Sequence, residues 1–335
     1  MKFRVIFFVL CAFLVLWMGL AAVGAAPSDA WQAIFQGSLG TKRAISGTLK
    51  EMTPLLLAGL AVFVALKAGL FNIGVEGQFL VGACAAAGVA LAIPNGFGMV
   101  LAVLASLVAG ALWAWPAAAI KVYRGGHEVI STIMLNNLAL LLTAVVVRGP
   151  LQSKTTESPT TASIADAARV PFLIENGSGR ELLRINAAWF LGFFLLAAFA
   201  FWLRSTVGGY ELRAVGANAK AAAFAGIDAG RLRLRSMLVS GGIAGLAGAF
   251  QVLAYEGRFY PNFSPGYGFD GLGVALLAGA SPWGLIPASF VFGVLAQGNI
   301  QLSIEGIPRG ISGVLLGLLI LSFAVVRYRE VRARG

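Results

Sequence analysis

Amide and carboxylate side chains interrupt an otherwise apolar stretch of the chain at residues 71–78, FNIGVEGQ. Two glycines in this segment weaken a helix, and a broken helix inside a membrane is typical of a solute path. The alternative is a tight cytoplasmic turn in which Glu76 is favoured by the dipole of the following helix. We favour the first interpretation and expect four side chains to line a substrate pathway: Phe71, Asn72, Glu76 and Gln78.

Two consecutive amides, Asn136 and Asn137, end a second polar segment, residues 125–137, GGHEVISTIMLNN. They fall about two turns into an apolar helix, where an amide needs a partner. The pair either joins helices or contacts a polar solute, and both alternatives stay open. His127 is the only histidine of the chain and has no second ligand nearby, so a helix start is favoured over a metal site.

A third polar segment, residues 205–235, separates two apolar runs. Asn218 fits an N-cap position, the alanines after it have the highest helix propensity, and Gly226 fits a C-terminal stop. We therefore expect a helix of two to three turns on the membrane surface. Such a helix either fits the groove of a partner protein or is an interfacial linker.

The chain that carries these segments is too apolar for a water-soluble protein. Of its 335 residues, 59% are hydrophobic and 12% are charged, and the mean hydropathy is +0.84. Several charge-free stretches reach the roughly 20 residues that cross a bilayer as a helix. The apolar runs are continuous and do not alternate, which favours helices over a barrel. We predict an all-α integral membrane protein with a single transmembrane domain over residues 1–335.

The apolar runs predict about ten transmembrane helices, at 5–24, 52–70, 76–94, 97–120, 129–148, 186–204, 236–255, 269–281, 284–301 and 310–326. The first run also resembles a cleavable signal peptide, but its length favours an uncleaved span. Fifteen of the 25 basic residues fall in loops that this arrangement places inside, so both termini are expected in the cytoplasm. This excess of basic residues in the cytoplasmic loops also explains the net charge of +11, so no nucleic-acid partner is needed to account for it.

A weak internal repeat relates residues 52–148 to residues 236–326. GLFNIGV at 69–75 is similar to GFDGLGV at 268–274, with a one-residue slip. The two halves would have opposite topology, as inverted repeats do in many transporters, although chance matches are common in apolar sequence. Between the halves lies an external segment, 149–185, for which contact with a receptor protein is a hypothesis.

Motifs for chemistry within the chain are missing. No G-x-x-x-x-G-K-[ST] phosphate loop occurs, and neither does H-E-x-x-H, G-x-S-x-G or a pair of intramembrane aspartates. We therefore expect no catalytic residue and no metal site, and an energy source on another chain. An ion-coupled secondary transporter is less favoured, because Glu76 and Asp270 at span boundaries are nearly the only carboxylates near the spans.

Four segments together resemble the permease subunits of bacterial ATP-binding-cassette importers: GLFNIGVEGQ, GGHEVISTIMLNN, ELRAVGANAKAAAFAGI and GFDGLGVALLAGASPWG. The resemblance covers roughly residues 50–327 and is to the branch that handles nucleosides, related to the ribose and branched-chain amino acid permeases. It implies a transport subunit, not an enzyme, in the bacterial inner membrane. Nucleosides, with purine nucleosides favoured, are the implied substrates, and ribose or another simple sugar is the alternative.

The same resemblance implies partners and further site residues. The partners would be an ATPase subunit that binds ATP and magnesium, a second permease in a heterodimer, an extracytoplasmic solute-binding protein and membrane lipid, with no cofactor in this chain. The segment around Asp270 would face the segment around Asn72 near the pathway. A coupling helix that docks into the ATPase would include Gly216, Asn218, Ala221, Ala222, Gly226 and Ile227.

Overall fold

The structure is a computed structural model that describes residues 17, 26–306, 310, 313, 314 and 317. Within this part of the chain almost all regular structure is helical, with one two-stranded sheet. The predicted first span, 5–24, and tenth span, 310–326, lie outside the described residues except at single positions. The placement of both termini lies outside them as well.

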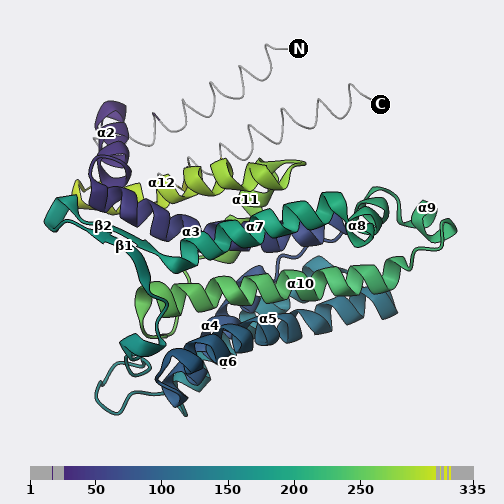
Figure 1. Cartoon of the computed structure of the whole chain (residues 1–335), viewed down its shortest axis with the longest axis horizontal. Helices are drawn as coiled ribbons and strands as arrows, with labels where there is room; N and C mark the ends of the chain where they lie inside the picture. Colours follow the sequence, from purple (N-terminus) through teal and green to yellow (C-terminus); the bar gives the residue numbers. More distant parts are fainter. Residues whose placement is uncertain (1–16, 18–25, 307–309, 311–312, 315–316, 318–335) are drawn as a thin grey trace.

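The helices alternate with short connections along the chain (Figure 1). The long ones are α3 (Lys42–Lys67), α4 (Val75–Ala92), α5 (Gly96–Arg124), α6 (Glu128–Arg148), α7 (Ala187–Ser205), α10 (Ala229–Phe250) continued by the π-helix η3 (Gln251–Glu256), and α12 (Leu285–Ile304) after the 3-10 turn η4 (Pro282–Gly284). The shorter elements are α2 (Pro27–Ser38), η1 (Asp166–Ala168), β1 (Phe172–Asn176), η2 (Gly179–Glu181), β2 (Leu183–Asn186), α8 (Val207–Ala217), α9 (Ala219–Phe224) and α11 (Tyr267–Ala278).

Seven helical segments of the described residues are long and apolar enough to cross a membrane, which confirms the all-α multi-span class. They correspond to the predicted second to seventh spans and the ninth. The eighth prediction, 269–281, coincides with the 12-residue α11. At 1.5 Å per residue this helix is about 18 Å long, shorter than the roughly 30 Å of a bilayer core. α11 cannot begin earlier, because Pro265 precedes it and Gly266 has a left-handed φ of +111°.

α3 begins at Lys42, ahead of the predicted residue 52, because the Thr41 side chain caps it by accepting a hydrogen bond from the Ala44 N–H at 3.1 Å. The extra turns carry the charged residues Lys50 and Glu51, which the hydropathy pattern assigned to a loop. The helix α2, which precedes α3, was not predicted.

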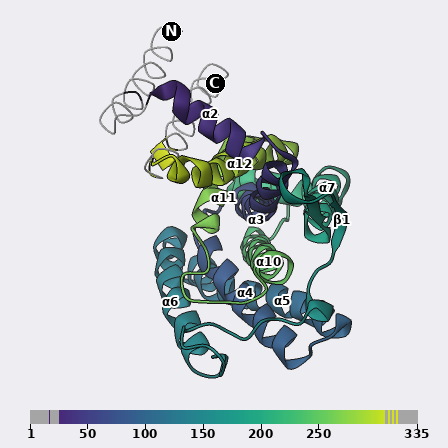
Figure 2. The same cartoon turned by 90° about the vertical axis from the view of Figure 1, so that its left-hand side faces the viewer.

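The core of the bundle consists of α3 and α10. In their most apolar windows 78% and 83% of the residues are buried, against 22–28% for α5, α6 and α7. α10 lies between α4, α5 and α6 on one side and α3, α7, α11 and α12 on the other (Figure 2). The outer helices α5, α6 and α7 therefore present apolar side chains outward, as helices in contact with lipid or another membrane protein do.

Glycines set the distance between α10 and its neighbours. A Cβ on Gly245 would collide with the Ser106 carbonyl of α5, and one on Gly248 would collide with the Phe79 carbonyl of α4. The backbones of three helices, α4, α5 and α10, meet at these glycines, which is the close approach that small residues permit between membrane helices.

The segment between α6 and α7 lies against one end of the bundle. Thr161 and Ile164 donate backbone hydrogen bonds to the carbonyls of Phe259 and Gly257, at 2.9 and 2.8 Å. Further along, β1 and β2 pair as an antiparallel hairpin with register Glu175 to Arg184. We call this the hairpin end of the bundle, and the opposite end, where α8 and α9 project, the loop end (Figure 1).

Both segments aligned by the proposed internal repeat lie at the beginnings of helices. Residues 69–75 lead into α4, and residues 268–274 form the first turns of α11. The repeat itself and the division of the chain into two halves stay predictions.

Candidate functional site

The connection from α3 to α4 is a break inside the bundle. α3 ends at Lys67, Gly69 takes φ +73°, and α4 starts at Val75. The first four residues of α4 are all buried, so the free N–H groups of its first turn do not reach water. These groups need partners within the protein, because neither lipid nor apolar side chains can supply them.

Asn72 supplies part of this pairing. Its side chain is fully buried, donates to Gln78 Oε1 at 2.9 Å and to Ser240 Oγ at 2.8 Å, and accepts from the Gly74 N–H at 3.0 Å. Gln78 returns a hydrogen bond from its Nε2 to Asn72 Oδ1 at 3.2 Å. The two amides thus fix the broken segment against α10, the helix that carries Ser240.

Asn136 supplies further pairing from α6. Its Oδ1 accepts from the Gly77 N–H at 2.8 Å, and its Nδ2 donates to the Ile73 carbonyl at 2.9 Å. One side chain therefore satisfies a backbone donor and a backbone acceptor at the break. Asn137 points elsewhere: it is exposed and donates to Ile133 O of its own helix at 3.2 Å. We call Asn72, Glu76, Gln78, Asn136 and Ser240 the break cluster.

Glu76 joins the starts of two helices. Its side chain is buried, and its Oε2 accepts from the backbone N–H of Gly268 at 2.7 Å. Because Glu76 lies in the first turn of α4 and Gly268 in the first turn of α11, one carboxylate faces the positive ends of two helix dipoles. Asp270, two residues after Gly268, also lies in the first turn of α11 and is partly exposed.

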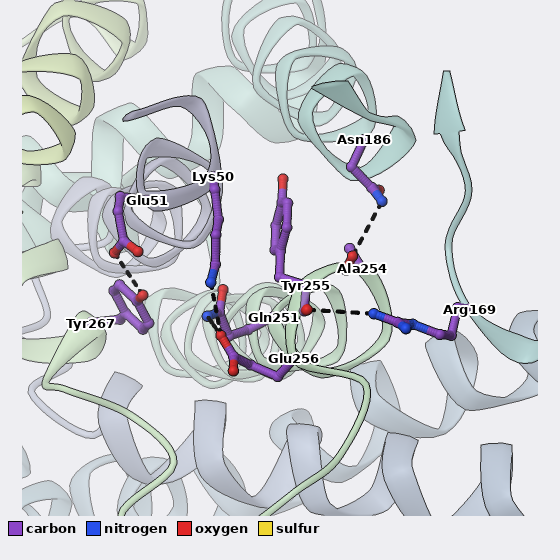
Figure 3. A network of polar contacts seen from close by, with 9 residues as sticks. All are labelled: Lys50, Glu51, Arg169, Asn186, Gln251, Ala254, Tyr255, Glu256 and Tyr267. Carbon is purple, nitrogen blue, oxygen red and sulfur yellow. Dashed lines mark hydrogen bonds and ion pairs between the residues drawn. The ribbon is translucent and has the colours of Figure 1, made fainter. Parts of the chain in front are cut away.

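A second polar group lies toward the hairpin end, between α3, η3 and α11 (Figure 3). Tyr267 OH donates to Glu51 Oε2 at 2.7 Å, and Lys50 Nζ pairs with Glu256 Oε1 at 3.0 Å. Gln251 Nε2 also reaches Glu256 Oε1, at 3.3 Å. We call Lys50, Glu51, Gln251, Tyr255, Glu256 and Tyr267 the hairpin-end cluster.

Sequence reasoning missed the hairpin-end cluster, because its residues lie at the edges of predicted spans or in predicted loops. Charged residues directly beside apolar runs, Lys50, Glu51 and Glu256, are the signal that could have indicated it. Nearby Tyr260 has a raised pKa through burial and through the Glu256 carboxylate, so its phenol stays protonated at neutral pH.

Two consecutive residues of α11 connect the two clusters: Tyr267 contacts Glu51 in the hairpin-end cluster, and Gly268 contacts Glu76 in the break cluster.

Of the seven predicted pathway residues, four are buried in the break: Asn72, Glu76, Gln78 and Asn136. The other three, Phe71, Asn137 and Asp270, reach the surface to different extents. That any of the seven contacts solute stays a prediction.

At the loop end, Asn218 caps α9, since its Oδ1 accepts from the N–H groups of Lys220 and Ala221 at 3.1 Å each. The helix has six residues, fewer than the expected two to three turns, because Gly226 with φ +82° ends it and Ile227 N–H bonds back to the carbonyl of the buried Ala222. Phe224, which sequence reasoning missed, is 94% exposed.

The loop end touches the break directly. A Cβ on Gly216 would collide with the Lys67 carbonyl at the end of α3, and the Gly216 Cα lies 3.8 Å from the Cβ position of Gly69. Arg233 Nε donates to the Ala68 carbonyl at 3.4 Å. Movement of α8 and α9 would therefore act on the residues that lead into α4.

Broken helices that meet inside a bundle of apolar helices are typical of polytopic transport proteins. The family model described as the permease component of branched-chain amino acid transport systems matches residues 44–324. The chain belongs to this family of ABC transporter permeases.

Relatives of this chain include the guanosine ABC transporter permease protein NupP of Bacillus subtilis, 37% identical over 90% of this chain and 86% of the relative. The glucose permease protein TsgB13 of Haloferax volcanii is 35% identical over 93% and 84%. The nucleoside permease protein NupB of Lactococcus lactis is 33% identical over 91% and 86%. No solved structure matches this chain.

The two neighbouring asparagines give a matched test of the break. We expect Asn136→Ala to lower the unfolding free energy by about 2 kcal/mol, because it leaves the Gly77 N–H and the Ile73 C=O unpaired. Asn137→Ala should stay close to the parent, because its side chain contacts only its own helix. Thermal unfolding of the purified proteins measures both, and equal losses for the two variants would contradict the assignment.

The contact between α4 and α11 is tested with Glu76→Gln. The variant keeps an acceptor for the Gly268 N–H but loses the charge between two helix starts, so we expect membrane-inserted protein at the parent level and uptake reduced several-fold. Immunoblots of membranes and uptake rates measure the two effects. Normal uptake would remove Glu76 from the translocation mechanism.

Proposed function

We propose that this chain is the permease subunit of an ATP-driven importer for nucleosides, with purine nucleosides favoured, in the inner membrane of a bacterium. The observation that carries the proposal is the similarity over about nine tenths of the chain to permeases named for guanosine and for nucleosides. The relative named for glucose supports a sugar as the second candidate substrate.

The proposed partners follow from the family and from the surface of the chain. An ATPase subunit, with ATP and magnesium bound to it, would dock on α9 at the loop end, and this chain would carry no cofactor. A solute-binding protein would deliver solute at the hairpin end. A second permease is supported by similarity to two guanosine permeases of Bacillus subtilis, NupP and, at 27% identity, NupQ.

The mechanism we propose is alternating access. Closure of the ATPase dimer would move α9 and α8, which press on the end of α3 and on Gly69 through Gly216. The break would then shift, and with it the contact of Glu76 with α11. No covalent step takes place in this chain, whose residues hold helices, offer amides and carboxylates to solute, and transmit movement.

Substrate identity is tested by uptake of a labelled purine nucleoside in cells with and without the gene, all partners being present. We expect gene-dependent uptake that excess unlabelled nucleosides block and that excess ribose, glucose or leucine does not. Block by glucose or ribose, with no effect of nucleosides, would favour the sugar alternative and leave the family assignment unchanged.

The docking of α9 is tested at Phe224. Burial of a phenylalanine side chain in a partner contributes about 2 kcal/mol, so Phe224→Ala should weaken binding of the ATPase by about tenfold or more. Phe201→Ala is the matched control, because Phe201 is 69% exposed on α7, away from α9. Titration of the ATPase against permease in nanodiscs gives the two affinities, and equal affinities for the two variants would contradict docking through Phe224.

A further inference from the structure

The hairpin-end cluster contains a buried hydrogen-bond acceptor that has no partner. Gln251 is 3% exposed, its Nε2 donates to Glu256, and its Oε1 has no hydrogen-bond partner among the described residues. The orientation of the amide is fixed by chemistry, because a carboxylate only accepts and the NH₂ group must face it. An unpaired buried amide oxygen is costly, which indicates a site built for a donor.

The π-helix η3 places this acceptor beside the carboxylate. Five residues of a regular α-helix would separate Gln251 from Glu256 by about 140° around the axis. A π-helix bonds residue i to residue i+5 and so brings the two side chains together, and π-helical turns of this kind are frequent at functional sites. Figure 3 shows both side chains on the side of η3 that faces Lys50 and Glu51.

The polar groups around Gln251 suit a ligand rich in hydroxyl donors. Among the described residues Glu51 accepts one hydrogen bond, from Tyr267, which leaves acceptor capacity on its carboxylate. The charged groups of the network, Lys50, Glu51, Glu256 and Arg169, sum to a formal charge of zero, which suits a neutral solute. The Lys50 and Glu256 side chains are 36% and 26% exposed, so the cluster is not sealed from solvent.

We propose that Gln251, Glu51 and Glu256 form a contact site for the hydroxyl groups of a neutral solute, such as the 2′,3′-diol of a nucleoside, on its way from the hairpin end to the break. This inference rests on the proposed function for its choice of solute. Solute bound at this site would affect the break through Tyr267, because the next residue, Gly268, is hydrogen-bonded to Glu76. The diol would donate to Gln251 Oε1 and to the carboxylates.

The test compares two solutes that differ only in the diol, guanosine and 2′,3′-dideoxyguanosine. The complete importer is reconstituted in proteoliposomes, and the binding protein is saturated with either solute so that its own affinity does not affect the rate. We expect the parent to transport guanosine about fivefold faster, the effect of one hydrogen bond of ordinary strength. Gln251→Met, similar in size but without the amide, should slow guanosine alone and bring the ratio close to one.

Gln36→Met, an exposed glutamine of α2 outside the cluster, is the matched control and should keep the parent ratio. Glu51→Gln gives a second, independent variant in case Gln251→Met does not insert, and it should also lower the ratio. Equal rates for the two solutes in the parent, or a loss in Gln251→Met that affects both solutes alike, would overturn the proposal. If the parent takes up no nucleoside, the proposed substrate is wrong. The site is then tested with glucose and 2-deoxyglucose, by the ratio of their two transport rates in the parent and in the variants.

Discussion

Backbone groups that leave a helix inside a membrane need partners from the protein, because lipid offers none. This constraint shapes the interior of the molecule at the break between α3 and α4. Asn72, in the connection itself, and Asn136 of α6 provide the partners, Gln78 of α4 holds the Asn72 side chain, and Glu76 extends the network to the start of α11. A break that is paired in this way is held in place by a few specific hydrogen bonds and not by a continuous helix.

The position of the break links both ends of the bundle. On its loop-end side, Gly216 and Arg233 contact the last residues of α3 and the first residues after it. On its other side, Glu76 meets α11, whose Tyr267 contacts Glu51 near the hairpin end. Hydrogen bonds and close backbone contacts therefore link the loop end, through the break and α11, to Glu51 near the hairpin end.

The contrast between core and outer helices explains how this network can exist in so apolar a chain. α3 and α10 are shielded at the centre, and the polar groups lie on them, on the starts of α4 and α11 and on the inward side of α6. The outward faces of α5, α6 and α7 carry apolar side chains. Glycines at 241, 245 and 248 let α10 approach α4 and α5 closely enough to leave little space for water or lipid. Close packing thus raises the cost of any unpaired polar group inside, which makes the unpaired oxygen of Gln251 an informative exception.

The sequence by itself determined the features that depend on local physics. Continuous apolar runs predicted a multi-span helical protein, the side chain of Asn218 predicted a cap, and Gly226 predicted the end of the helix that follows. Only the tertiary structure decided which of Asn136 and Asn137 turns inward, that Glu76 meets Gly268 far along the chain, that α11 is short, and that Gln251 lies beside Glu256. The reason is physical: hydropathy and capping act over a few residues, whereas the partner of a buried polar group is chosen by whichever helix packs against it.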